Sequence, residues 1–372
     1  MEKAISQDSD ICVRPAGNAD QSFENHWFCA ALCKDGQVVM LDSDTPANFL
    51  PMLDNSVLAW IDYRTANFEA DVRRGATQLG FKEQLINSLM DDPRLLYEDH
   101  DTEMGIKLPS IQIRIDGKID VQSYTTILLL RKNFILTVHP ILVDRRFTRL
   151  RRYSNTILSK VSMEISGEDK LTMLLIRIID QNNDRNFEHL RQIEERGDHL
   201  NKSLMDPNTP RAELGPQIYD MKHALIEYLN ALWQTVDVLH DLRSGDANLL
   251  TNDPKLLDRV GFLAEDVSRQ IGLAEHMSDV LASGLEVLQT IYNNQLQAMN
   301  NRMAYLMTYL TVLGTAVLVP NTLATIFGNS AFGMGPQDTG WYITMLVGST
   351  LIATVLAFWW VRKSGFIPKK MD

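Results

Sequence analysis

Two uncharged stretches near the C-terminal end decide the architecture of this chain: MAYLMTYLTVLGTAVLVPNTLATIFG (Met303–Gly328) and WYITMLVGSTLIATVLAFWWV (Trp341–Val361). Each stretch is long enough to cross a hydrocarbon core of about 30 Å as a helix. Aromatic pairs stand at the two ends of the second stretch, Trp341-Tyr342 and Trp359-Trp360, as is typical of membrane interfaces. Basic residues follow at once, so we expect residues 362–372 to form a basic cytoplasmic tail.

The N-terminal residues complete the predicted topology. The first fifteen, MEKAISQDSDICVRP, have neither the apolar core nor the basic leader of a signal peptide, so we expect the N-terminus to stay in the cytoplasm. Two crossings return the chain to the same side, which makes residues 329–340 an external loop. The expected location is the cell (inner) membrane, as a multi-pass protein in contact with lipid.

Composition excludes several classes of protein. A formal net charge of −11 over 372 residues argues against a nucleic-acid partner, which would require a basic face. The three cysteines give no disulfide framework and fit a reducing compartment. We find no Gly-rich phosphate loop, nucleophile elbow or His/carboxylate metal spacing, so we expect neither an enzyme nor a prosthetic group.

Residues 1–143 are predicted to be an α/β domain. A hairpin signal at Lys34-Asp35-Gly36 joins two apolar runs. Helical spacing follows over Phe68–Leu89, broken near Gly80, and Arg131-Lys132-Asn133 joins the last two strands. The predicted strands are Trp27–Leu32, Gln37–Leu41, Val57–Tyr63, Ile111–Ile115, Thr125–Leu130 and Phe134–Val138.

Residues 144–302 are predicted to be a helical stalk. Ser166 followed by Asp169 resembles a capping box that opens a helix of roughly 35 residues. The run Pro207–Pro210 ends it, and a second helix extends to about Leu242. Asp253-Pro254 predicts the start of a third helix, which continues to about Phe327 and would be about 110 Å long. That length suits a stalk that enters a membrane, with residues 303–328 as the first transmembrane helix and 341–361 as the second.

Polar residues repeat along the first crossing. Asn and Thr recur at intervals of seven, and Gln297, Thr311 and Thr325 lie three residues after members of this set, so all fall near one helix face. Such a stripe should avoid lipid, because unsatisfied polar groups in hydrocarbon are costly. Several copies around an axis would enclose a pore, whereas the alternative is that the threonines bond their own helix and pack helices closely. The repeating residues are Asn294, Asn301, Thr308, Thr315 and Thr322.

The residues Gly328-Asn329, placed just after a helix that contains Pro320, resemble the CorA superfamily of magnesium and other divalent-cation channels, which includes the zinc-transporting ZntB branch. The likeness covers nearly the whole chain and includes Ala59-Trp60-Ile61-Asp62, TTILLLRKNFILTVHP (Thr125–Pro140) and the tail Arg362–Phe366. The resemblance implies a CorA-like funnel, a homopentamer, and Mg²⁺ (or Zn²⁺) as the transported ion.

The family carries Gly-Met-Asn, or Gly-Val-Asn and Gly-Ile-Asn in zinc-type relatives, at the pore entrance. Here the tract Gly328-Asn329-Ser330 has no residue between Gly and Asn, so either one residue is deleted or Ser330 occupies the Asn place. By resemblance these three residues form the filter. Neutral carbonyls there would hold a hydrated Mg²⁺ through its waters and still release it.

Acids between subunits sense metal in the family, and the resemblance implies Glu265, Asp266 and Asp279 as candidate regulatory ligands for the same ion. A solvated helix face is the alternative interpretation of these acids. Two further hypotheses remain beside a magnesium channel: zinc transport, and a non-conducting membrane-anchored protein.

Overall fold

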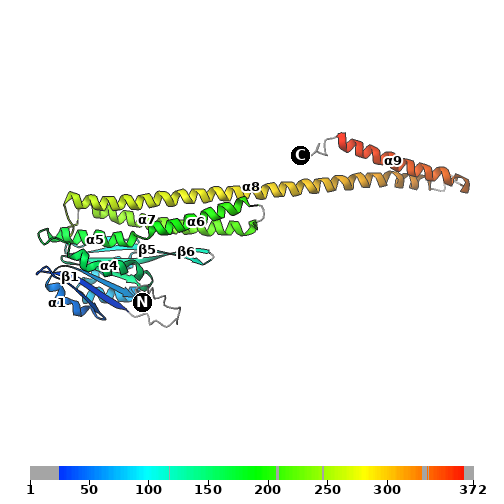
Figure 1. The fold of residues 1–372 in the computed structure, drawn as a ribbon. Helices are drawn as coiled ribbons and strands as arrows, with labels where there is room; N and C mark the ends of the chain where they lie inside the picture. The colour runs from blue at the N-terminus through cyan, green and yellow to red at the C-terminus, as the bar shows by residue number, and fades with distance from the viewer. Residues whose placement is uncertain are drawn as a thin grey trace, which may run out of the picture. The chain divides into compact units, whose positions relative to one another are not determined.

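The computed structural model of this chain describes residues 25–116, 118–206, 209–244, 247–328, 333 and 335–363. The chain divides into an N-terminal unit, Met1–Gly284, and a C-terminal unit, Leu285–Asp372. Helix α8 (Pro254–Phe327) begins in the first unit and ends in the second. The elements in Figure 1 follow the predicted order: an α/β domain, helices, one very long helix and a last apolar helix.

The N-terminal unit is built on one seven-stranded sheet with the strand order β2-β1-β3-β7-β6-β5-β4. Only β3 and β7 pair in parallel, and the other neighbours are antiparallel. The sequence predicted six of these strands, but it missed β4 and the full length of the β5–β6 hairpin. The strands are β1 (His26–Cys33), β2 (Val38–Ser43), β3 (Ser56–Thr65), β4 (Tyr97–Asp99), β5 (Glu103–Asp116), β6 (Lys118–Arg131) and β7 (Phe134–Pro140).

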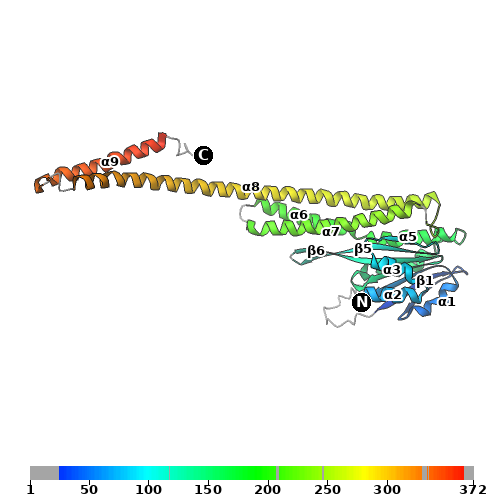
Figure 2. The same cartoon turned by 180° about the vertical axis from the view of Figure 1, so that it is seen from behind.

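Helices cover both faces of this sheet, as Figures 1 and 2 show. One face carries η1 (Pro46–Phe49), α1 (Leu50–Asp54), α2 (Phe68–Gln78) and α3 (Glu83–Asp91), whose apolar side chains join the buried core. The other face carries α4 (Asp144–Leu158), which follows η2 (Ile141–Val143), together with α5 (Gly167–Asn183) and α7 (Arg211–Ser244). A strand covered on both sides is buried along its length, and β3 is buried almost throughout, including the acid Asp62.

The predicted break near Gly80 is confirmed. Gly80 separates α2 from α3 with a φ of 88°, a left-handed conformation that glycine adopts at little cost. The predicted single helix after Ser166 is wrong in part. Ser166 does cap α5, since its hydroxyl accepts from the Asp169 N–H at 3.0 Å. The chain then leaves the helix at Asp184 and Arg185 before α6 (Asn186–Met205) begins.

A buried arginine explains this break. Arg146 of α4 donates to the Asn182 carbonyl oxygen, which in a continuous helix would accept from the Asn186 N–H instead. The Asn182 side chain is also held by the sheet, because its Nδ2 donates to the Pro109 carbonyl at 2.8 Å and its Oδ1 accepts from Ser110 Oγ at 2.6 Å. Burial lowers the pKa of Arg146 to about 10. Tertiary contacts therefore end α5 where the local sequence gives little sign of a stop.

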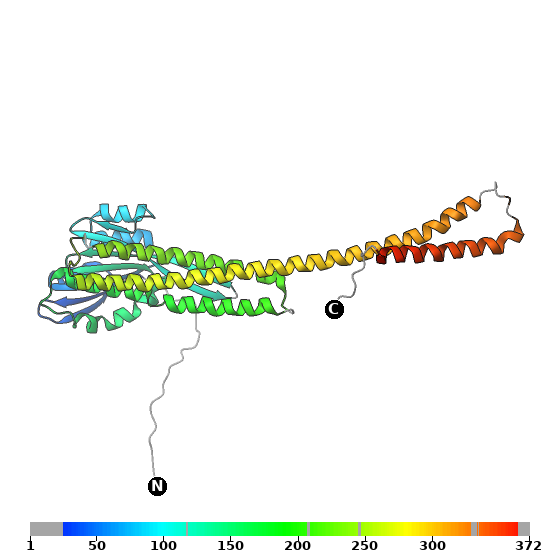
Figure 3. The ribbon, with the colours of Figure 1, turned by 90° about the horizontal axis from the view of Figure 1, so that it is seen from above.

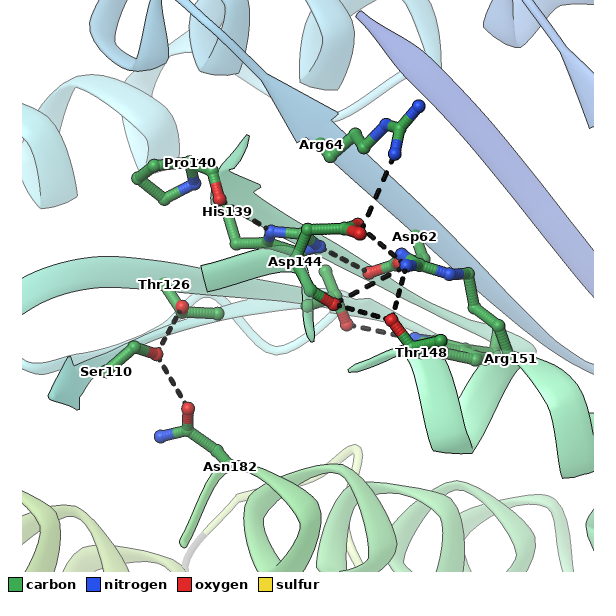
Figure 4. A network of polar contacts seen from close by, with 12 residues as sticks. Asp62, Arg64, Ser110, Thr126, His139, Pro140, Asp144, Thr148, Arg151 and Asn182 are labelled. Atoms are coloured by element: carbon green, nitrogen blue, oxygen red, sulfur yellow. Dashed lines mark hydrogen bonds and ion pairs between the residues drawn. The ribbon is translucent and has the colours of Figure 1, made fainter. Parts of the chain in front are cut away.

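A second polar network docks α4 onto the sheet, as Figure 4 shows. Asp62 on β3 and His139 on β7 are fully buried, with 3.2 Å between Oδ1 and Nε2. Arg151 of α4 donates to Asp62 and, at 2.7 Å, to Asp144, which also faces Arg64 at 3.6 Å. Burial alone raises the pKa of the Asp62 carboxyl, but His139 and Arg151 outweigh it and hold that pKa below its usual range.

The start of α8 is as predicted. The Asp253 carboxylate accepts from the Lys255 N–H at 3.1 Å, and Pro254 occupies the first helical position. Up to Gly284 this helix packs against α6 and α7 (Figure 3). A Cβ at Gly284 would lie 3.4 Å from the side chain of Leu204 on α6 and 4.0 Å from that of Ile218 on α7. The N-terminal stretch of α8 is thus part of the N-terminal unit.

The C-terminal unit is a pair of apolar helices. The remainder of α8 is followed by η4 (Pro336–Asp338) and α9 (Thr339–Lys363). Both α8 and α9 contain windows that are long and apolar enough to cross a membrane, and almost none of the residues in these windows are buried. Large apolar side chains such as Leu306 and Leu310 are about two-thirds exposed, at 68% and 67%. Surfaces of this kind require lipid or partner helices.

Candidate functional site on the polar face of α8

The predicted polar stripe lies on one unbroken helix. Asn294, Asn301, Thr308, Thr315 and Thr322 all fall within α8 and are at least partly exposed. On a straight helix a seven-residue repeat drifts by roughly 20° per step, so the stripe winds slowly around the axis. Thr311 and Thr325 lie on the side toward which it drifts, which widens the polar face and keeps it continuous.

The threonine hydroxyls all donate to carbonyl oxygens one turn earlier. This bonding was predicted as the alternative to a pore, yet it also fixes what the face offers outside the helix. Because each hydroxyl proton points inward, the oxygen presents lone pairs outward as an acceptor. The bonds are Thr308 to Ala304 at 2.8 Å, Thr311 to Met307 at 2.8 Å, Thr315 to Thr311 at 2.9 Å, Thr322 to Leu318 at 2.6 Å and Thr325 to Asn321 at 2.8 Å.

The face is also uncharged. No Asp, Glu, Lys or Arg occurs between Arg302 and Asp338. A neutral row of oxygen acceptors attracts cations weakly and repels anions, because it can solvate a positive ion but offers few donors to a negative one. The amides of Asn294 and Asn301 add carbonyl acceptors at the N-terminal end of the stripe.

The C-terminal end of α8 requires glycine. The Gly328 N–H donates to the Ala324 carbonyl at 2.9 Å, and a Cβ at Gly328 would lie only 2.6 Å from that oxygen. The Tyr342 hydroxyl of α9 donates to the same carbonyl at 3.3 Å, and Phe327 meets Trp341 edge to face with ring centroids 6.3 Å apart. These contacts join the end of α8 to the start of α9. Asn329 and Ser330, the other predicted filter residues, lie outside the described part of the chain.

The three predicted regulatory acids do not converge within one chain. Asp266 pairs with Arg269 one turn away on its own helix, while Glu265 and Asp279 are exposed. Among the described residues, no three His, Cys, Asp or Glu side chains are grouped so that they could hold a metal ion. A metal site built from these acids would need ligands from a second copy of the chain.

Sequence reasoning missed two charged features of the N-terminal unit. One is the buried network of Asp62, His139 and Arg151, whose only sequence signal is an acid inside the apolar run of β3. The other is a basic groove beside α4, lined in part by Arg177 and Arg259. The lining residues that lie farthest apart in the sequence are separated by more than a hundred positions, so no local sequence motif indicates this groove.

Comparison with known proteins agrees with the predicted resemblance. A family model described as CorA-like Mg²⁺ transporter protein matches residues 55–363, which is most of the chain. The chain belongs to the CorA family. Its members are membrane transporters of divalent cations, which fits the two apolar helices and the neutral acceptor face of α8. No curated protein sequence matches the chain.

Solved structures share the CorA fold with this chain at low identity. The complete CorA magnesium transporter of Methanocaldococcus jannaschii has a TM-score of 0.64 at 17% identity, covering 92% of this chain and 98% of that one. The ZntB cytoplasmic domain of Vibrio parahaemolyticus RIMD 2210633 has a TM-score of 0.52 at 16% identity, covering 73% and 98%. The full-length CmaX protein has a TM-score of 0.58 at 12% identity, covering 93% and 100%.

Proposed function

We propose that this CorA-family chain forms a homo-oligomeric channel, a pentamer by resemblance, that conducts Mg²⁺ across the cell membrane. The observation that supports it is the polar face of α8: a row of threonine oxygens whose protons are all donated inward. Copies of this face around an axis would line a water-filled path mainly with oxygen acceptors. The apolar sides of α8 and α9 would then face neighbouring helices and lipid.

The chemistry of this face favours magnesium over zinc. Mg²⁺ prefers oxygen ligands and keeps its waters, whereas Zn²⁺ prefers imidazole and thiolate. From Leu285 to Gly328 the sequence offers Asn, Gln and Thr but neither His nor Cys. Zinc transport is the second candidate, because the ZntB cytoplasmic domain from Vibrio shares the fold of the N-terminal unit.

Gly328, Asn329 and Ser330 are proposed as the entrance. Gly328 ends α8 where no side chain fits, so the backbone can turn away from the axis there. Asn329 or Ser330 would offer an uncharged oxygen to the waters of an arriving ion. Glu265, Asp266 and Asp279 remain proposed regulatory ligands, to be completed between subunits.

Ion flux into liposomes tests the channel. Thr315→Phe should abolish Mg²⁺ influx, measured with an entrapped magnesium dye, because five bulky rings would close the path. Leu313→Phe is the matched control: it lies two residues away on the same helix, is 64% exposed, and points about 200° from Thr315 around the helix. It should leave influx nearly unchanged.

Equal influx in the two variants would contradict a pore along this face. Absence of influx in the unmodified protein, reconstituted as an intact oligomer, would favour the non-conducting anchor. Parallel influx measurements with Zn²⁺ and an entrapped zinc dye identify the transported ion. Faster entry of Zn²⁺ than of Mg²⁺ would mean that the channel conducts zinc instead of magnesium.

A further inference from the structure

A basic groove lies in the N-terminal unit, away from the proposed pore. It is formed by the C-terminal end of α4 and the turn after it, by the middle of α5 and by the second turn of α8. Its volume is 320 Å³, within the range of roughly 300–1,000 Å³ that small-molecule sites occupy. The groove therefore has room for a ligand of modest size.

Its lining is cationic in an acidic protein. Lys160, Arg177 and Arg259 line the groove, and no acidic side chain does, although the chain as a whole has a formal charge of −11. One carboxylate lies beside it: Asp180 is 3.9 Å from Arg177, in a pair whose side chains are both more than half exposed. Among the described residues, neither Lys160 nor Arg259 has an ion-pair partner. Asp180 also interacts electrostatically with Arg259 and offsets part of the basic charge, but Lys160, Arg177 and Arg259 are exposed and accessible to an anion.

The basic character extends along α4. Arg145, Arg149 and Arg152 are exposed and follow one another at helical spacing, so they share a face that leads toward Lys160. Arg149 is paired with Asp184 at 3.5 Å. Like charges gathered on one face repel one another, and a bound polyanion relieves that repulsion.

The rest of the groove is apolar and aromatic. Leu58, Leu158 and Leu174 form buried walls at 1%, 1% and 4% exposure. Tyr153 stands at the groove half exposed, with its ring free of any aromatic partner among the described residues, and Thr156 supplies a hydroxyl. A tyrosine face stacks well on a planar ring, and apolar walls shield it from water.

We propose that this groove binds a nucleoside phosphate, with its phosphates on Arg177, Arg259 and Lys160 and its base against Tyr153 and the leucine walls. Guanidinium groups match phosphate oxygens in paired hydrogen bonds, which is why two arginines and a lysine favour phosphate over a single carboxylate. The site draws residues from β3, α4, α5 and α8, so a ligand here joins the second turn of the long helix to the sheet and to the helices that cover it.

Isothermal calorimetry on the full-length protein in nanodiscs of zwitterionic lipid tests this site. EDTA in every solution keeps the result independent of divalent-cation transport. The probes are ATP, AMP, adenosine and inorganic phosphate. ATP should bind most tightly and AMP less tightly. Adenosine and inorganic phosphate should bind most weakly, because adenosine lacks the phosphate contacts and inorganic phosphate lacks the base contacts. Tyr153→Ala should weaken AMP more than phosphate.

Variants that replace one arginine by uncharged glutamine test whether ATP affinity depends on the groove. Arg177→Gln and Arg259→Gln should each weaken ATP binding by about 10-fold or more, the usual cost of losing a hydrogen bond to a charged group. Arg269→Gln is the matched control, since this exposed arginine lies on α8 ten residues further along and does not line the groove. It should leave affinity within twofold. All three positions are exposed, so folding should be retained and can be checked by circular dichroism.

The proposal is overturned if ATP does not bind, or if the double variant Arg177→Gln/Arg259→Gln binds it as tightly as the unmodified protein. Inorganic phosphate binding as tightly as ATP would overturn the nucleoside part. Mg²⁺ influx plays no part in these measurements, so failure of the channel proposal would leave their outcome unchanged.

Discussion

Replacing Asp62 by Asn should destabilise the N-terminal unit strongly. Asp62 is fully buried and faces His139, whose side chain is fully buried too, and Arg151, whose side chain is 16% exposed. Removing one partner of a buried ion pair leaves the other charge uncompensated and typically costs about 3–5 kcal/mol. Arg151 keeps its ion pair with Asp144 at 2.7 Å, but among the described residues His139 keeps only one hydrogen-bond partner, the Pro140 carbonyl at 3.0 Å. We therefore expect a cost near the lower limit, about 3 kcal/mol.

Hydrogen exchange followed by mass spectrometry on the full chain measures this cost. Amides of β3 and β7 should exchange about 150-fold faster in Asp62→Asn, which corresponds to about 3 kcal/mol. The chain supplies a matched control on the same sheet: Asp42 faces His26 at 3.2 Å, but its side chain is 68% exposed. Asp42→Asn should cost about 0.5 kcal/mol or less.

The same pair predicts a pH dependence. Because the pKa of Asp62 is lowered in the folded protein, this carboxylate contributes stability above its unfolded pKa of about 3.9. That contribution is lost as pH falls below about 4 and through the folded pKa, and Asp62→Asn should lack this part of the acid sensitivity. If Asp62→Asn costs no more than Asp42→Asn at neutral pH, the stabilising role of the buried network is refuted.

Three further predictions concern the membrane part. Single cysteines at Ser330 and Lys369 should react with impermeant reagents from opposite sides of the membrane, and labelling of both from one side would exclude two crossings. Asn329→Ala should strongly reduce Mg²⁺ influx with assembly intact, whereas Asn329→Asp should bind cations more tightly and release them more slowly, since a ring of carboxylates holds a divalent ion firmly. Normal influx in Asn329→Ala would transfer the entrance role to Ser330. The protein should form a homo-oligomer in nanodiscs, and a monodisperse monomer by native mass spectrometry would contradict the proposed pore.

Much of the architecture follows from local signals in the sequence. The two apolar stretches gave α8 and α9, and Asp253-Pro254 gave the start of the long helix, because capping and hydrophobic length act on neighbouring residues. The break at Gly80 is equally local, since its left-handed φ depends on the absence of a side chain. The threonine repeat also placed the polar face of α8 correctly on one helix.

The parallel pairing of Ser56–Thr65 with Phe134–Pro140 was not available from the sequence, because it joins strands separated by the whole β4–β5–β6 segment. The break between α5 and α6 depends on Arg146, which reaches the Asn182 carbonyl from another helix. The basic groove likewise exists only after α4, α5 and α8 meet. In each case the feature depends on contacts between residues that are far apart in the sequence. The sequence predicted most of the helices, six of the seven strands and the two long apolar helices, whereas tertiary packing decided which charges are buried together and which are left facing solvent.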